Sequence, residues 1–283
     1  YLQQHAGGPL IGLLILDLSG SSKKLAATIA SLRLEKNLYA TVNIVVLSVN
    51  DVPATSAQGK LHFIKIDAHE YVARLNQVVE QSSFDWIMLV NAGDEFTPAG
   101  LMMLALELVA APDCRAVYGD ELQRLPNGDL GGAFRPAFNL DMLLAFPTGM
   151  ASHWLIRRDA FLELGGFDPE FGDALAFELL VRLIEKEGGQ GIGHIDEPLL
   201  ITDAPILRDN SQERLVIERH LAWRGYQGTV SAKLPGRYRI NYGHQAQPLV
   251  SIIIPTKDQL PILTRCVESL LEKTRYQHYE VLI

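Results

Sequence analysis

The sequence is short of cysteine, of long apolar runs and of positive charge. Its 283 residues include 2 cysteines, Cys114 and Cys266, which lie far apart and form no C-x-x-C pair. This argues against a disulfide framework or a cysteine metal cluster and favours a reducing, cytoplasmic setting. The longest apolar stretch, 101–111, contains Glu107 and is too short to span a membrane. The net charge of −8 argues against a nucleic-acid partner.

What the chain does contain is an alternation of strand-like and helix-like segments. Continuous apolar runs at 10–16, 43–47, 61–66 and 85–90 predict strands that are buried on both faces. Ser21-Ser22 predicts the start of a helix that runs to about residue 35, a second helix is predicted over 72–81, and Thr97 before Pro98 predicts the cap of a third. The alternation predicts a three-layer α/β/α fold around a mixed sheet. Its ligand site is expected where the carboxyl ends of the strands meet.

The pattern loosens after residue 110 but continues. Short strands are predicted at 116–118 and 152–156, and a late strand is predicted to begin at 192–195, with a turn at 126–129 and a sharp loop at 165–168. Helices are predicted at 174–187, closed by Gly188, and at 211–224, closed by Gly225. An edge strand follows at 237–242, so that the segment 205–243 completes a first domain.

The chain repeats its own opening near its end. Residues 9–15 correspond to 248–254, and 44–46 correspond to 281–283, at offsets of 237 to 239 residues. This spacing is too long for a solenoid repeat and predicts a duplicated domain: 1–243 as the first copy, 248–283 as the beginning of a second, and 243–247 as linker. The alternative is two unrelated strand–helix–strand units that share a pattern by physics alone. The second copy stops in mid-strand at Ile283, so we expect a longer protein.

The second copy resembles the opening of family 2 glycosyltransferases through LVSIIIPTKD at 249–258 and YEVLI at 279–283. The first copy has further landmarks in the family's order: FDWIMLVNAGD at 84–94, YGDE at 118–121 and GGFD at 165–168. The resemblance implies the GT-A fold, a nucleotide-sugar donor, a glycan acceptor, a divalent cation (Mg or Mn) and an inverting transfer. It further implies a bacterial protein of polysaccharide synthesis, a role compatible with peripheral association at the inner face of the membrane.

Such a transfer needs carboxylates in two places. A divalent cation that offsets the charge of a diphosphate leaving group binds carboxylate oxygens, and a second carboxylate deprotonates the acceptor hydroxyl. The family places the first in an Asp-x-Asp after the fourth strand and the second in the helix after the Gly-Gly-Phe loop. Here these positions read Asn91-Ala92-Gly93 and Ala176. Asp94 and Glu178 are the neighbouring carboxylates.

The resemblance therefore makes Glu178 the candidate catalytic residue and Asp94 the candidate metal ligand. The candidate donor-binding residues are Asp17, Ser48, Asp94, Asp120 and Glu121. Two interpretations stay open. Either the first copy kept the fold and lost its metal site, or Asp94, Asp120 and Glu121 rebuild a carboxylate cluster in a variant arrangement.

Four of the candidates, Asp94, Asp120, Glu121 and Glu178, also have an ordinary structural explanation. Asp94 can cap a turn. Asp120 and Glu121 can be solvated residues of a turn, and Glu178 can pair with Arg182 one helical turn away. These explanations compete with the functional ones at every position.

Two other classes of function also fit the sequence. One is a non-catalytic module that binds a glycan or a nucleotide. Arg135 could then contact a diphosphate, although a solvated surface position is the ordinary expectation for it. The other is a nucleotidyltransferase, for which Gly20-Ser21-Ser22-Lys23 would be a poor phosphate loop.

Overall fold

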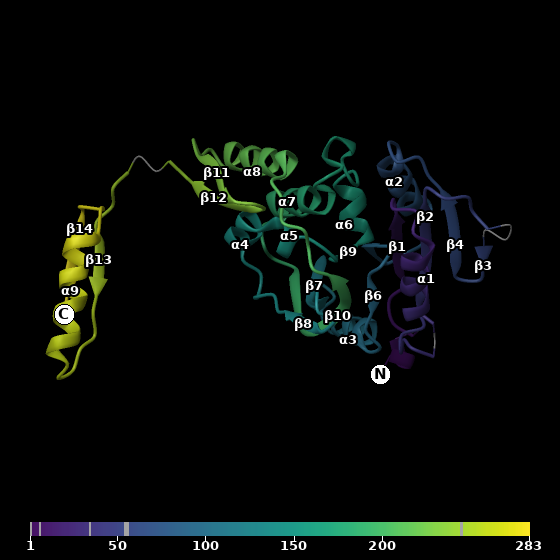
Figure 1. Ribbon diagram of the computed structural model, residues 1–283, viewed down its shortest axis with the longest axis horizontal. Helices are drawn as coiled ribbons and strands as arrows, with labels where there is room; N and C mark the ends of the chain where they lie inside the picture. Colours follow the sequence, from purple (N-terminus) through teal and green to yellow (C-terminus); the bar gives the residue numbers. More distant parts are fainter. Residues whose placement is uncertain (1, 6, 34, 54–56, 244–245) are drawn as a thin grey trace.

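The structure is a computed structural model that describes residues 2–5, 7–33, 35–53, 57–243 and 246–283. Over these residues, ten strands form one mixed central sheet (Figure 1). They are β1 (Ile11–Asp17), β2 (Val42–Ser48), β3 (Ala57–Gln58), β4 (Leu61–Lys65), β5 (Trp86–Asn91), β6 (Glu95–Phe96), β7 (Ala116–Arg124), β8 (Leu130–Ala133), β9 (Leu155–Arg157) and β10 (Ile192–Asp203). Their order is β3-β4-β2-β1-β5-β9-β7-β10-β6, with β8 on β7.

One half of the sheet is parallel and the other half is mixed. Strands β4, β2, β1 and β5 run parallel, with Ile11 opposite both Val42 and Trp86. Strand β9 is antiparallel to both of its neighbours, β5 and β7, and so joins the two halves. Strand β10 then returns parallel to β7. Because β5 and β7 are both antiparallel to β9, they run in the same direction, and their carboxyl ends lie on one edge of the sheet.

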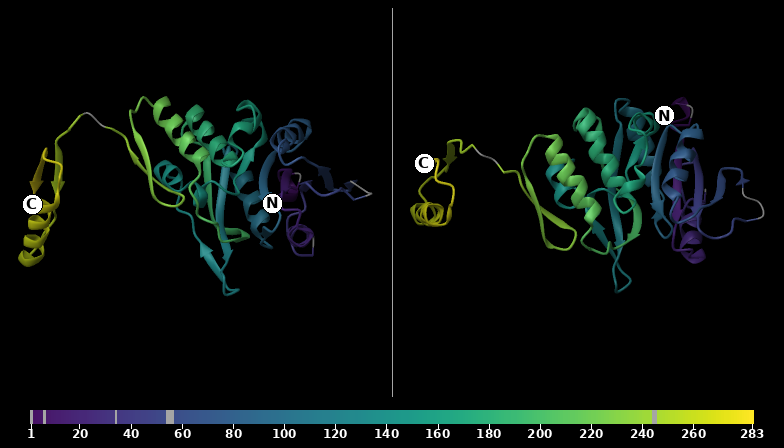
Figure 2. Two further views of the ribbon diagram at one scale, coloured as in Figure 1. Left: turned by 45° about the horizontal axis from the view of Figure 1, so that its top comes forward. Right: turned by 90° about the horizontal axis from the view of Figure 1, so that it is seen from above.

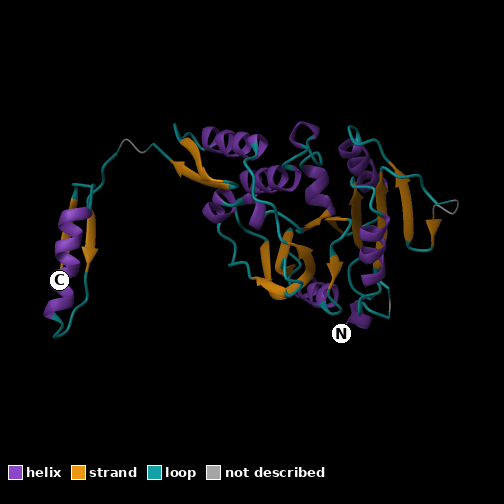
Figure 3. Ribbon diagram, in the orientation of Figure 1, coloured by secondary structure: helices purple, strands orange, loops and turns teal. Residues whose placement is uncertain are grey.

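Helices cover both faces of the sheet (Figure 3). They are α1 (Ser22–Ser31), α2 (Tyr71–Gln81), α3 (Gly100–Ala110), α4 (Leu140–Ala145), α5 (Pro147–Met150), α6 (Arg158–Glu163), α7 (Leu175–Glu187) and α8 (Ser211–Trp223). Alternate residues of β1 enter different cores: Leu14 packs in the cluster with α2 and α7, whereas Leu13 packs in the cluster with α3. This alternation follows from the strand period of two. The predicted three-layer α/β/α fold with a mixed sheet is confirmed.

Several local predictions hold and others are wrong. The Ser21 side chain accepts a hydrogen bond from the backbone N–H of Lys24, as expected of an N-cap, but α1 ends at Ser31 rather than near residue 35. Thr97 does not cap α3, whose N-cap is Ala99. The Thr97 hydroxyl instead donates to the carbonyl of Pro198 at 2.6 Å, which ties the start of this helix to β10.

Two strands also have bounds other than those predicted. Strand β9 begins at Leu155 rather than at 152, because His153 has a φ of 57°, outside the extended region. Strand β7 continues to Arg124, so Asp120 and Glu121 lie inside a buried strand and not in a solvated turn. These two differences together shape the candidate site.

The C-terminal part of the described chain forms a separate strand–helix–strand unit. A hairpin, β11 (Thr229–Leu234) with β12 (Arg237–Asn241), is followed by β13 (Val250–Ile253), α9 (Leu260–Lys273) and β14 (Tyr279–Leu282). Strands β13 and β14 pair in parallel with each other and belong to no other sheet of the described residues. The unit lies apart from the main body in every view (Figure 2). Of the predicted linker, His244 and Gln245 lie outside the described residues.

The two proposed copies share a hydrogen bond as well as a sequence pattern. The hydroxyl of Tyr39 donates to the carbonyl of Pro9 at 2.6 Å, and the hydroxyl of Tyr276 donates to the carbonyl of Pro248. In each case a tyrosine before the second strand reaches the residue before the first strand. The repeated contact supports the duplication, and the tandem organisation of the chain stays a prediction. Within the described residues no helix is both long and apolar enough to cross a membrane.

The central strand β1 gives a direct test of the core. Leu13 is 0% exposed, whereas Leu38 is 62% exposed. We expect Leu13→Ala to lower the free energy of unfolding by about 2–5 kcal/mol, because it leaves a cavity between β1 and α3. The matched variant Leu38→Ala should change it by less than about 0.5 kcal/mol. Urea denaturation measures both, and equal effects would contradict the assigned layers.

Candidate functional site

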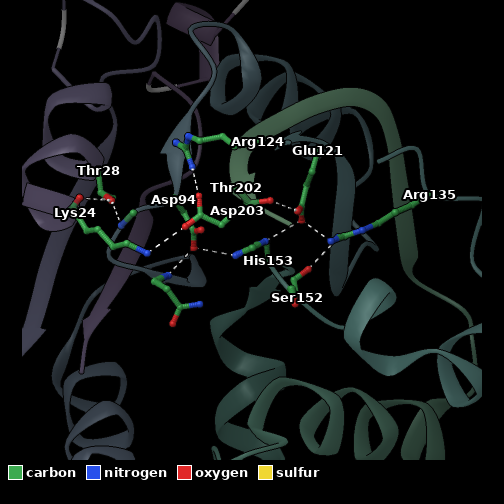
Figure 4. Close-up of polar contacts among 12 residues, drawn as sticks. Lys24, Thr28, Asp94, Glu121, Arg124, Arg135, Ser152, His153, Thr202 and Asp203 are labelled. Carbon is green, nitrogen blue, oxygen red and sulfur yellow. Dashed lines mark hydrogen bonds and ion pairs between the residues drawn. The ribbon is translucent and has the colours of Figure 1, made fainter. Parts of the chain in front are cut away.

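The main candidate site is a cavity of about 330 Å³ at the carboxyl edge of the sheet (Figure 4). It lies where β5, β7 and β10 end, and α1 contributes Lys24 from the side. Its lining residues that carry charge or a hydroxyl are Lys24, Asp94, Glu121, Arg135, Thr148, Ser152, His153, Thr202 and Asp203. Two of the predicted site residues, Asp94 and Glu121, are therefore brought together here.

His153 bridges the two carboxylates. Its Nε2 lies 3.1 Å from Oδ2 of Asp94, and its Nδ1 lies 2.8 Å from Oε1 of Glu121. An ionised carboxylate can only accept a hydrogen bond, so both ring nitrogens donate and the ring is an imidazolium. Burial alone would lower the pKa of His153, but the negative charge of Glu121 and the hydrogen bonds that the ring donates to both carboxylates outweigh it and raise the pKa to about 10.

Glu121 is the most heavily engaged carboxylate of the cavity. Besides His153 it accepts from the guanidinium of Arg135, and its Oε2 accepts from the hydroxyl of Thr202 at 3.2 Å. Burial raises the pKa of Glu121, yet the charge of His153 and these donors prevail and bring the pKa down to about 2. The carboxylate is thus ionised at any physiological pH.

Arg135 is buried, so the expectation of a solvated position is wrong. One of its guanidinium nitrogens donates to the carbonyl of Ser152 at 2.9 Å. Its backbone N–H donates to Oδ1 of Asp120 at 2.8 Å, which places Asp120 behind the cavity rather than on its wall. His194 lies 3.5 Å from the same Asp120 oxygen. Arg135 therefore connects the two predicted carboxylates of β7 to the loop that carries His153.

Asp94 is held by the turn after β5. Its Oδ2 accepts from the backbone N–H of Asn91 at 2.7 Å as well as from His153, so the predicted turn-capping role is confirmed. The next residue upstream, Gly93, has a φ of 114°, and its N–H donates to the hydroxyl of Thr28 at 2.8 Å. The turn is thereby fixed against α1.

A second group of charges stands at the mouth of the cavity. Lys24 and Arg124 each contact Asp203 at 3.1 Å, and Arg124 also contacts Glu95 at 2.5 Å. The pKa of Asp203 is lowered mainly by the hydrogen bond from Lys24. Lys24 and Asp203 are largely exposed, so this contact is weak and can exchange for a ligand group.

Asp17 and Ser48 form a pair of their own. They face each other at the carboxyl ends of β1 and β2, where the Ser48 hydroxyl donates to Oδ2 of Asp17 at 2.8 Å. Both side chains are buried. Neither is among the lining residues of the cavity around Asp94, so the six predicted site residues do not form one cluster.

Glu178 is fully buried in α7 and lies away from the cavity. Its carboxylate accepts from Nε of Arg182 at 2.7 Å and from the guanidinium of Arg219 at 2.7 Å. The predicted pairing with Arg182 is confirmed, and Arg219 from α8 is an addition to it. Ala176, two residues earlier, lines a smaller space of about 110 Å³ beside Asn91 and His153. The position that the resemblance assigns to the base thus lies beside His153 and carries a methyl group.

The donor set does not fit a divalent cation. In the part of the chain that the structure describes, no group of three or more His, Cys, Asp or Glu side chains could hold a metal ion. The Asp94 and Glu121 oxygens that face each other already accept hydrogen bonds from His153. A cation at this point would have to displace an imidazolium from two carboxylates.

Sequence reasoning missed His153, Lys24 and Thr202. His153 stood inside a predicted strand, with no local signal for a left-handed backbone. Lys24 stood in the helix predicted from Ser22 to about residue 35. Thr202 lay beyond residues 192–195, where a late strand was predicted to begin.

The buried ion pair of Glu178 predicts a large effect on stability. We expect Glu178→Gln to lower the free energy of unfolding by about 3 kcal/mol, because it leaves two arginines without their shared counter-charge. The matched variant Glu163→Gln removes an exposed pair with Lys186 and should cost less than about 1 kcal/mol. Thermal and urea unfolding measure both variants. Equal small losses would contradict the structural role.

The raised pKa of His153 predicts a pH dependence of stability. Its folded pKa of about 10 lies above the ordinary 6.5, so its stabilisation is complete below about pH 6.5 and is lost as the pH rises toward 10. We expect the stability difference between wild type and His153→Asn to shrink by about 1.4 kcal/mol per pH unit over this range. Asparagine tolerates the left-handed backbone, which keeps strain comparable. A difference that stays constant from pH 6.5 to 10 would contradict the bridge.

Comparisons with known proteins place the fold. No family model matches the chain. Over 211 residues, 70% of the chain, it is 31% identical to the O-antigen biosynthesis protein RfbC of Myxococcus xanthus. Over 222 residues, 74% of the chain, it is 30% identical to the uncharacterized protein y4gI of Sinorhizobium fredii. The chain spans only 16% and 24% of these two relatives.

Solved structures of the same architecture include TarS of S. aureus. The TarS 1-349 structure matches with a TM-score of 0.57 at 12% identity, over 75% of this chain and 64% of that one. Its complex with UDP-GlcNAc matches with a TM-score of 0.57 at 11% identity, over 75% and 66%. At such identities the likeness concerns the fold alone. Together with the curled mixed sheet, it shows that this chain has the GT-A glycosyltransferase fold.

Proposed function

We propose that this chain is part of a family 2 type glycosyltransferase that builds a cell-surface polysaccharide in the cytoplasm or at the inner face of the membrane. Its donor is a nucleotide sugar, its acceptor is a glycan hydroxyl, and the transfer inverts the anomeric centre. The observation that carries the proposal is the charged cavity at the carboxyl edge of a GT-A sheet. The name of the relative RfbC and the TarS complexes with UDP and UDP-GlcNAc support it.

Within the cavity, Lys24 is the side chain best suited to a diphosphate. It is half-exposed, its partner Asp203 is exposed, and its contact can be exchanged without unpairing a buried charge. The protonated His153 and the guanidinium of Arg135 lie deeper, where each is paired with a carboxylate. A nucleotide diphosphate at the mouth would therefore meet Lys24 as the exchangeable cation.

A second candidate is a non-catalytic binding module that serves a neighbouring domain. The lack of a free carboxylate at positions 176 and 178 favours this binding module. An inverting transfer needs a carboxylate within hydrogen-bond reach of the acceptor hydroxyl. Both oxygens of Glu178 are held by Arg182, one of them also by Arg219, and Ala176 has no proton acceptor. On this view turnover belongs to the neighbouring domain that this module serves.

Both proposed functions require a nucleotide sugar to bind at the cavity, so a binding experiment tests what they have in common. The experiment is calorimetry with a panel that includes UDP, UDP-GlcNAc and GDP-linked sugars. We expect at least one of these ligands to bind, and its affinity to fall about tenfold in Lys24→Ala, because the variant loses one charge-assisted contact. Lys65→Ala is the matched control. Lys65 is 57% exposed and pairs with Asp51, much as Lys24 is 53% exposed and pairs with Asp203. Absence of any binding, or equal losses in both variants, would contradict the assigned site.

Turnover separates the two candidates. We expect the 283-residue chain to show no robust donor hydrolysis or sugar transfer, because the base position is Ala176 and Glu178 is enclosed by arginines. Asp94→Asn and Glu178→Gln are assayed alongside, and circular dichroism checks that Glu178→Gln is folded under the assay conditions, because its loss of stability alone could abolish turnover. Clear turnover that Asp94→Asn abolishes, or that Glu178→Gln abolishes while folded, would place an active centre in this copy and reject the binding-module interpretation.

A further inference from the structure

The cavity at the sheet edge is electrically balanced without any bound ion. Its described lining residues include three carboxylates, Asp94, Glu121 and Asp203, and three cations, Lys24, Arg135 and His153. Each carboxylate contacts at least one of these cations. A divalent cation added here would meet no uncompensated negative charge, which removes the main electrostatic reason for it to bind.

The imidazolium ring of His153, with its two N–H groups, fills the position between the carboxylates of Asp94 and Glu121. Oδ2 of Asp94 accepts from His153 and from the Asn91 backbone, and Oε1 of Glu121 accepts from His153 and Arg135. The other oxygen of Glu121 accepts from Thr202. The lone pairs that a hard cation would use are thus engaged by donors that the chain itself supplies.

The backbone holds this ring in place. His153 has a left-handed φ of 57°, a region that few residues other than glycine adopt, although asparagine, aspartate and histidine do so more often than most. On one side Arg135 binds the Ser152 carbonyl. On the other side the Trp154 indole donates to the Met150 carbonyl at 2.6 Å and its ring stacks on Tyr118 at 4.4 Å. The two neighbours of His153 are therefore both anchored.

We propose that the His153 side chain is a built-in cation that takes the place of a divalent metal between Asp94 and Glu121, so that this cavity works free of metal. His153 acts as a positioning residue, since it sets the geometry and charge of the two carboxylates. The inference concerns the affinity of the cavity for a metal ion. It can be tested without a nucleotide, so its failure is distinct from a failure of the proposed function.

Calorimetric titration of the full 283-residue chain with Mn²⁺ alone is the test. We expect wild type to bind with a dissociation constant above about 1 mM. His153→Gly should bind at least about tenfold more tightly, because the two carboxylates lose their shared counter-charge while glycine accepts the left-handed backbone. His69→Gly removes an exposed histidine elsewhere and should behave as wild type. Micromolar binding by wild type that Asp94→Asn abolishes, or no gain in His153→Gly, would overturn the proposal.

A measurement on wild type alone covers the case in which the glycine variant does not fold. In ¹⁵N-detected NMR of the imidazoles at pH 7.5, we expect both ring nitrogens of His153 to carry protons. We also expect its signals to stay sharp when Mn²⁺ is added to about 1 mM. A single protonated nitrogen, or selective paramagnetic broadening of His153, would overturn the proposal irrespective of any variant.

Discussion

The contact of His153 with Asp94 and Glu121 is the interaction on which the arrangement of this sheet edge depends. Asp94 follows β5, the last strand of the parallel half, and Glu121 belongs to β7 in the mixed half. His153 precedes β9, the antiparallel strand that lies between them. One protonated ring therefore closes the edge across three neighbouring strands. Without its charge, two buried carboxylates would face each other across the cavity and repel.

The same contact constrains the chemistry that this domain can perform. A GT-A fold that transfers sugar with a metal needs free carboxylate oxygens at the edge and a carboxylate near the acceptor. Here the oxygens of Asp94 and Glu121 that face each other already accept hydrogen bonds from His153, and Glu121 also accepts one from Arg135. Ala176 carries no carboxylate, and Glu178 pairs with two arginines. Cations at the mouth remain available to a diphosphate. The exposed contact between Lys24 and Asp203 is the one that a ligand can exchange without unpairing a buried charge.

The C-terminal strand–helix–strand unit shares one contact with the beginning of the first domain. The Tyr39 contact with Pro9 has its counterpart in the Tyr276 contact with Pro248, so both units close their first turn in the same way. None of the residues of α9, all of which the structure describes, is buried. A duplicated protein can keep chemistry in one copy and let the other diverge, because only the core pattern is needed for the fold.

The sequence by itself determined the layers and much of the local structure. Apolar runs placed β1, β2, β4 and β5, Ser21 capped α1, and Gly188 ended α7, because these depend on residues close together in the chain. It also selected Asp94 and Glu121. Tertiary structure alone decided what these carboxylates do, since His153 comes from 59 and 32 residues away through a left-handed turn that no local pattern announces. It likewise decided that Arg135 is buried and that Arg219 joins Glu178, because burial and charge pairing depend on which distant elements pack together.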